Sequence, residues 1–248
     1  MARHPQSPPK SLLRQAGRAI ADYQMIRAHD RLLLGVSGGK DSLSLLHILK
    51  HLQRHAPIPF TLAAATIDPQ IPGFNPSHLP EHYRDFDVEW HYESQPIMEQ
   101  AFTHMAGDSF CAYCARMKRG ILYRLCREQN YNVLVLAQHL DDLAESLLLS
   151  LFHGGQLRTM KAHYVNSDGD VRIIRPLIYC RERQTRAYAI HAQLPVVPDN
   201  CPACFEKPTR REHVKALLAN EEQQNPQVFL SLLCAMRPLL TTGDVTTH

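Results

Sequence analysis

The sequence lacks any run of about eighteen consecutive apolar residues, the length that a helix needs to cross a bilayer. The first residues, Met1-Ala2-Arg3-His4-Pro5, have no apolar stretch of the kind found in a secretory signal peptide. Internal repeats and low-complexity segments are also missing. We therefore expect a globular protein of the cytoplasm with no membrane partner.

An excess of charge is missing too, because the formal net charge of +3 is small for 248 residues. That value alone is too small to indicate a nucleic-acid partner, although clustered basic residues would permit one. A hydrophobic content of 44% and a charged content of 21% are ordinary for a folded chain, so the sequence can bury a sizeable core.

The seven cysteines form no even set, and in a chain without a secretory signal an odd number argues against a disulfide framework. Four of them form two C-x-x-C pairs, Cys111 with Cys114 and Cys201 with Cys204. Such pairs hold zinc, hold an iron–sulfur cluster or act as a redox dithiol. Structural zinc takes four ligands in a closed site, whereas three thiolates on a [4Fe–4S] cluster leave one iron open.

The ligand count does not choose between zinc and an iron–sulfur cluster. The other cysteines stand alone in apolar surroundings, so we predict that they are small core residues. They are Cys126, Cys180 and Cys234.

A phosphate-binding turn is the most informative feature of the chain. Residues 32–36 are typical of a buried strand, and the leucines of residues 43–49 have the spacing of a helix. Between them lies Ser37-Gly38-Gly39-Lys40-Asp41-Ser42. Paired glycines let the backbone approach an anion, the helix start attracts it, and Lys40 adds a positive charge. The pattern differs from G-x-x-x-x-G-K-[ST], because the glycines are adjacent and Asp41 follows the lysine.

Strands and helices alternate over the first two thirds of the sequence. We expect strands at residues 60–67, 88–92, 133–137 and 172–174, and helices at residues 43–54, 79–86, 110–126, 143–152 and 182–192. Gly154-Gly155 should cap the C-terminal end of the helix at residues 143–152. The fold class is therefore α/β, with a Rossmann-like parallel sheet covered by helices on both faces.

We divide the chain into three parts. Residues 1–25 form a basic arm and an amphipathic helix, and residues 26–200 form the α/β domain with the first cysteine pair. Residues 201–248 hold the second pair and a helical C-terminal extension, in which Pro226 is a break. The leucine-rich helices at residues 143–152 and 228–240 fit the core or a subunit interface, and a homodimer is one expectation.

Two carboxylates follow predicted strands, where ligands bind in parallel sheets. Asp68 follows the second strand and suits a ribose hydroxyl, a metal ion or simply an exposed loop. Asp142 follows the fourth strand. The helix at residues 110–126 has a basic face. That face holds Arg116, Lys118, Arg119 and Arg124.

Taken together, these motifs resemble the tRNA 2-thiocytidine biosynthesis family of the PP-loop ATP pyrophosphatase superfamily. The resemblance runs from about Arg14 to about Arg211. It is carried by Ala19-Ile20-Ala21-Asp22-Tyr23, residues 36–42, Pro72-Gly73-Phe74, residues 119–124, Asp141-Asp142, Gly154-Gly155, Arg175-Pro176-Leu177 and Tyr179-Cys180-Arg181-Glu182.

The resemblance implies a PP-loop fold like that of the adenine nucleotide alpha hydrolases, with ATP, Mg²⁺ and a [4Fe–4S] cluster as cofactors. Cys111 and Cys114 would be cluster ligands, with the third from Cys201 or Cys204. ATP would adenylate the C2 oxygen of a cytidine in the anticodon loop of a tRNA, and sulfur would replace it. A cysteine desulfurase or another sulfur donor would be the further partner.

Residue roles follow from the same resemblance. Ser37, Gly38, Gly39, Lys40, Asp41, Ser42 and Asp68 would bind the nucleotide. Lys40, Asp41 and Asp142 would be catalytic, with Lys40 stabilising the departing pyrophosphate and the carboxylates positioning Mg²⁺ or water. Arg116, Lys118, Arg119, Arg124 and Arg175 would meet tRNA.

The chain departs from the family where a base or a nucleotide would lie. Ala137-Gln138-His139 stands where a glycine and two histidines are usual, and the loop after the second strand reads Ile67-Asp68-Pro69-Gln70-Ile71. The alternatives are a PP-loop enzyme that thiolates or amidates another nucleoside or small molecule, and a zinc-stabilised nucleotide-binding protein without turnover.

Overall fold

The computed structural model describes residues 6–104, 110–198 and 209–241. Its helices and strands, in chain order, are α1 (Lys10–Asp22), β1 (Asp30–Gly35), α2 (Lys40–His55), β2 (Phe60–Asp68), α3 (Leu79–Asp85), β3 (Glu89–Ser94), α4 (Ile97–His104), α5 (Phe110–Glu128), β4 (Val133–Val135), α6 (Leu140–Gly154), β5 (His163–Val165), β6 (Arg172–Ile174), α7 (Glu182–His191), α8 (Arg210–Gln224), α9 (Val228–Met236) and the 3₁₀ turn η2 (Arg237–Leu239). In this part of the chain, no helix is both long and apolar enough to cross a membrane.

The strands form a sheet in the order β3-β2-β1-β4-β6-β5. The pairs from β3 to β6 are parallel, as the sequence predicts, whereas the edge strand β5 is antiparallel to β6. The chain passes from β1 to β2 on one side and reaches β4 on the other side of β1. The crevice beyond the carboxyl ends of β1 and β4 is therefore a topological switch point, where α/β proteins place ligands.

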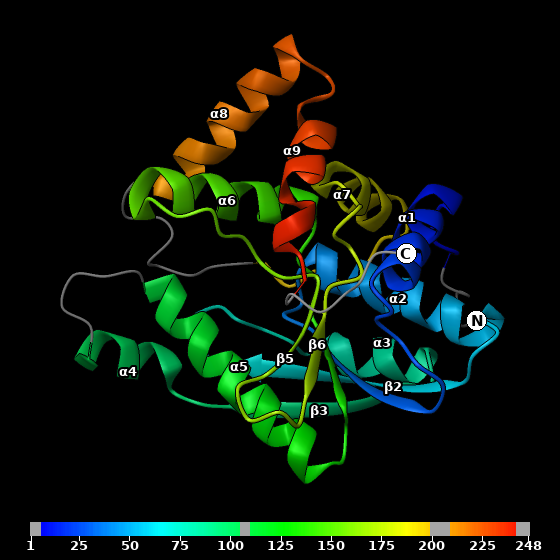
Figure 1. Cartoon of the computed structure of the whole chain (residues 1–248). Helices are drawn as coiled ribbons and strands as arrows, with labels where there is room; N and C mark the ends of the chain where they lie inside the picture. The colour runs from blue at the N-terminus through cyan, green and yellow to red at the C-terminus, as the bar shows by residue number, and fades with distance from the viewer. Residues whose placement is uncertain (1–5, 105–109, 199–208, 242–248) are drawn as a thin grey trace.

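Alternating side chains of the central strands pack into two cores, one on each face of the sheet. Leu32 and Leu34 belong to the larger core with helices α1, α2, α6 and α7, while Leu33 belongs to the smaller core with α5. Figure 1 shows the same layering, with α4 and α5 on one side of the sheet and α1, α2, α6 and α7 on the other.

The two ends of the chain contribute to the larger core. Leu12 and Ala16 of α1 and Phe229 and Met236 of α9 are buried in it with the central strands. The predicted division at residues 25 and 200 stays a prediction, but the helices on either side of it share one core.

Several local expectations are confirmed and a few are wrong. Gly155, at φ 59°, caps α6 in the left-handed conformation, as the paired glycines predict. Helix α4 and strand β5 are not among the elements that the sequence predicts. Cys126 and Cys180 are buried core residues, but Cys234 is exposed on α9, so its prediction as a core residue is wrong.

Candidate functional site

The phosphate turn joins β1 to α2, as predicted. Gly38 has φ 84°, and a Cβ atom there would lie 2.7 Å from the Val197 side chain. The Val197 amide also donates to the Gly38 carbonyl at 3.0 Å. Within the turn, the Ser42 hydroxyl donates to the Gly39 carbonyl at 2.9 Å. Helix α2 begins at Lys40, so its positive N-terminal end meets the turn.

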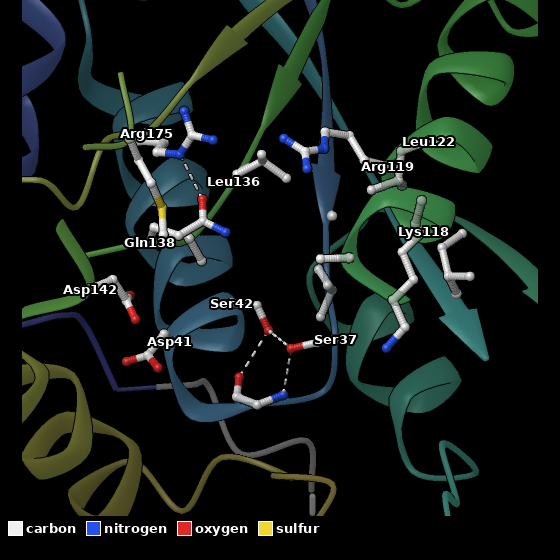
Figure 2. Close-up of a pocket in the computed structure, with 18 of the residues that line it drawn as sticks. Ser37, Asp41, Ser42, Lys118, Arg119, Leu122, Leu136, Gln138, Asp142 and Arg175 are labelled. Carbon is white, nitrogen blue, oxygen red and sulfur yellow. Dashed lines mark hydrogen bonds between the residues drawn. The ribbon is translucent and has the colours of Figure 1, made fainter. Parts of the chain in front are cut away.

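A cavity of about 540 Å³ opens beside this turn. Figure 2 shows side chains entering it from the turn, from α5 and from the segments after β4 and β6. Eight of the predicted site residues line it, namely Ser37, Gly39, Asp41, Ser42, Lys118, Arg119, Asp142 and Arg175. The structure thus brings together residues that are up to 138 positions apart in the chain.

Lys40 lies beside the turn and is held by two carboxylates. Its Nζ atom is 3.0 Å from Asp41 Oδ2 and 3.0 Å from Glu182 Oε1 of α7. Burial works against the charged form, but Asp41 and Glu182 together raise the pKa of the Lys40 ammonium. Burial likewise opposes ionisation of Glu182, yet hydrogen bonds from Lys215 and Lys40 lower its pKa to about 2. Lys40 is therefore a positive charge that is fixed in place.

Asp41 points from the first turn of α2 toward the cavity. The Thr185 hydroxyl donates to Asp41 Oδ1, and Lys40 donates to Oδ2. Both oxygens of this carboxylate are thus held, which orients it.

The neighbouring carboxylates Asp141 and Asp142 have different surroundings. Asp141 is buried, accepts from the Arg181 guanidinium at 3.1 Å and caps α7 by accepting from the Glu182 amide at 2.8 Å. Asp142 lines the cavity and closes a capping box with His139, whose amide donates to Asp142 Oδ2 at 3.0 Å. The geometry therefore assigns a structural position to Asp141 and a cavity position to Asp142.

Besides Gly38 and Lys40 of the turn, further predicted site residues lie outside the cavity lining. Asp68 lies at the end of β2 but accepts from Tyr92 at 2.5 Å and from the Gln70 amide at 2.7 Å. Arg124 lies two turns further along α5 than Lys118 and is paired with Glu93 and Glu128. Arg116 is exposed on a different face of α5 from the cavity-lining Ala115, Lys118, Arg119 and Leu122. Of the basic residues that the sequence assigns to this helix, only Lys118 and Arg119 therefore line the cavity.

Arg175 lines the cavity but is almost fully buried, with 4% of its surface exposed. Its Nε donates to Gln138 Oε1 at 2.8 Å, its Nη1 donates to the Lys161 carbonyl at 2.5 Å, and the guanidinium lies 5.5 Å from the Tyr164 ring centroid. Burial lowers the pKa of Arg175, although Tyr164 opposes this. Arg175 therefore positions its neighbours, rather than offering an open surface to a phosphate.

Sequence reasoning missed Arg211 and Gln138, which both line the cavity. Arg211 reaches it from α8 and pairs with Asp142 at 2.5 Å and with Glu145 at 2.6 Å. No local motif surrounds Arg211, so only the packing of α8 against α6 reveals it. Gln138 had a signal, because it stands where the resembled family usually has histidine.

The cysteine pairs lie largely outside the described side chains. Cys201 and Cys204 fall in residues 199–208, and the side chain of Cys111 is not described. Cys114 is a half-buried thiol on α5, one residue before the cavity-lining Ala115. Among the described residues, no group of three His, Cys, Asp or Glu side chains could hold a metal ion. The ligand set therefore stays a prediction.

Comparison with known proteins gives a consistent result. Residues 10–222 match the family described as the PP-loop domain. The chain is 40% identical over 231 residues to the tRNA-cytidine(32) 2-sulfurtransferase of Geobacter sulfurreducens, covering 92% of this chain and 89% of the relative. It is 36% identical to the protein of the same name from Nitrosomonas europaea, over 92% of this chain and 73% of the relative.

A solved structure shares the fold at low sequence identity. The U34-tRNA thiolase NcsA from Methanococcus maripaludis, with its [4Fe-4S] cluster, superposes with a TM-score of 0.76 and 19% identity, covering 96% of this chain and 80% of that one. At that identity, the likeness concerns the fold.

Proposed function

Because the chain belongs to the PP-loop family, and within it to the tRNA-cytidine(32) 2-sulfurtransferases, we propose that it is an ATP-dependent enzyme that thiolates cytidine 32 of tRNA. The C2 oxygen of the base attacks the α-phosphorus of ATP, and pyrophosphate leaves. Sulfide then attacks C2, the C–O bond breaks, and AMP leaves. Where a cysteine desulfurase is the sulfur donor, a thiol reductant must first reduce its persulfide to sulfide. The adenylation makes a poor leaving group into a good one.

One observation carries this proposal: the cavity holds the phosphate turn, two carboxylates and several cations in one space. The amides of the turn and the start of α2 bind the phosphates, and Lys40 stabilises charge on the departing pyrophosphate. Asp41 and Asp142 would hold Mg²⁺, which needs few protein carboxylates because it keeps several waters.

The tRNA reaches the cavity along α5. Lys118 and Arg119 line the cavity and Arg116 is exposed on the same helix, so a phosphate backbone meets positive charge before it meets the site. A sulfur step also needs a base that is splayed out of its stack, since single-stranded loops present their edges to proteins.

The cysteines suit an iron–sulfur cluster by their chemistry. Cys111 and Cys114 are one helical turn apart on α5, the helix whose face lines the cavity. With a third thiolate from Cys201 or Cys204, a bound [4Fe–4S] cluster would supply one open iron to bind sulfur. A homodimer also stays part of the proposal.

The test is an anaerobic purification, followed by an absorption spectrum and an iron, sulfide and zinc count per chain. We expect a brown protein with about four irons and four sulfides. Nucleoside analysis of tRNA from a deletion strain should then show the loss of 2-thiocytidine. A colourless protein with one tightly held zinc, in a strain whose tRNA keeps its 2-thiocytidine, would overturn the proposal.

A further inference from the structure

Gln138 has a feature that its sequence position does not explain, namely a carboxamide held in one orientation. Its Oε1 accepts from the nearly buried Arg175 Nε at 2.8 Å. A flipped amide would set an NH₂ group against a guanidinium, which is donor against donor. Figure 2 shows the result, with the Gln138 nitrogen turned away from Arg175 and into the cavity.

Arg175 is itself fixed, so the orientation of Gln138 does not depend on a mobile partner. The guanidinium donates to the Lys161 carbonyl and stacks on Tyr164, in addition to its bond to Gln138. Among the described residues, no atom accepts a hydrogen bond from Gln138 Nε2. The cavity therefore contains a rigid, neutral donor without a protein partner.

The sheet order separates this donor from the nucleotide. The phosphate turn follows β1, and the apolar Ala65 and Ile67 of β2 line the cavity on one side of it. Gln138 and Arg175 follow β4 and β6 on the opposite side of β1. If the adenine of ATP lies on the apolar β2 side of the cavity, the β4 side is left for the tRNA base that accepts sulfur.

We propose that Gln138 is a specificity-determining residue, whose Nε2 donates to the unprotonated N3 of the target cytosine. This inference rests on the proposed function. Cytosine N3 is an acceptor beside the C2 that reacts, whereas uracil carries a proton on N3. A fixed donor at this place favours cytosine and opposes uracil, because an unmatched polar pair in a closed site is costly.

The decisive variant is Gln138→Glu, which keeps the shape and the bond to Arg175 but replaces the donor by an acceptor. The full-length protein, purified anaerobically, is tested with anticodon stem-loops that carry cytidine or uridine at position 32. Binding is measured with a non-hydrolysable ATP analogue present, and sulfur transfer is measured with ATP. We expect the preference for cytidine to fall about tenfold to hundredfold in both measurements, with ATP affinity unchanged within about twofold.

Two further variants separate the hydrogen bond from the fold. Gln138→Met removes the donor without adding an acceptor, so it should lose cytidine binding and gain nothing with uridine. Gln129→Glu makes the same chemical change at an exposed site near the far end of α5 and should leave the preference intact.

The outcomes are distinct. An unchanged cytidine preference in Gln138→Glu would overturn the inference, and so would an equal loss of ATP binding, which would place Gln138 at the nucleotide. Absence of sulfur transfer by the unaltered protein would overturn the proposed function instead. The binding preference would still decide the role of Gln138 in that case.

Discussion

The two sides of the cavity are built in different ways. On the β1 side, six consecutive residues, 37–42, make a turn whose ligands are mainly backbone groups and a helix start. On the β4 and β6 side, the polar groups are side chains from three separate segments: Gln138 and Asp142, Arg175, and Arg211. The first side is a local structure, whereas the second exists only when α6, α8 and β6 pack together.

This difference indicates which side of the cavity determines the specificity for the acceptor base. A backbone cradle binds any nucleoside triphosphate in much the same way, because phosphates look alike. On the opposite side, where single side chains line the cavity, one residue can be replaced without disturbing the phosphate turn. We therefore expect substitutions on the β1 side to remove ATP binding, and those on the opposite side to spare ATP binding but impair transfer.

Asp142→Asn should have the largest effect. The amide keeps the acceptor that caps α6 at the His139 amide, but it removes the charge that would hold Mg²⁺. AMP formation should fall at least about a thousandfold, with ATP affinity changed only a few fold. Rapid-quench measurement of AMP and titration calorimetry would check both. A near-normal rate would show that Asp142 is not catalytic.

Gly38→Ala tests the β1 side of the cavity, where the phosphate turn lies. The new Cβ would lie 2.7 Å from Val197 at φ 84°, so the turn must move, and we expect ATP affinity to fall by about a hundredfold and stability by about 1–3 kcal/mol. Isothermal titration and thermal unfolding would measure these changes. Gly155→Ala is the matched control, since it is strained at φ 59° but meets no atom within 4 Å.

That control should lose stability and keep ATP binding. Adding Val197→Ala to Gly38→Ala should restore part of the affinity, because it removes the atoms that the new methyl meets. If Gly38→Ala bound ATP normally, the turn would not be the phosphate site.

The same contrast explains what could be predicted from the sequence. The central parallel strands, the turn and the cap at Gly155 follow from local patterns, so they were predicted within a few residues. The sequence indicates Asp142 by its place after a strand and in the Asp-Asp motif of the resembled family, but neither feature separates it from Asp141. The physical difference is the ion pair of Asp141 with Arg181, which exists only in the folded chain. The Arg211–Asp142 pair and the Arg124–Glu93 pair join residues about 30 to 70 positions apart, which periodicity does not reveal.

The basic helix α5 offers a sharper comparison within one element. Lys118→Ala should weaken tRNA binding several fold and lower the salt slope by about one, because one phosphate contact is lost. Arg124→Ala should change binding less than twofold, since Glu93 and Glu128 already pair with its guanidinium. Filter binding between about 50 and 200 mM salt would measure both. Equal effects would mean that tRNA covers the whole helix.

The smallest effect on activity should come from substituting His47, a residue of α2 that does not line the cavity. Its Nδ1 is 2.6 Å from the Tyr188 hydroxyl and its Nε2 is 3.1 Å from His82 Nε2, and burial, with a contribution from His82, lowers its pKa to about 3. Below pH 6.5, which is about the ordinary pKa of histidine, the unfolded state binds a proton at His47 that the folded state does not. The free energy of unfolding should therefore fall as the pH drops from 6.5 toward 3. His47→Asn should reduce that slope by up to about 1.4 kcal/mol per pH unit, measured by urea unfolding. At neutral pH the variant should leave both the ATP affinity and the cytidine preference unchanged, because this buried, neutral side chain contacts neither side of the cavity. Loss of either property would show that the packing of α2 against α7 affects the site.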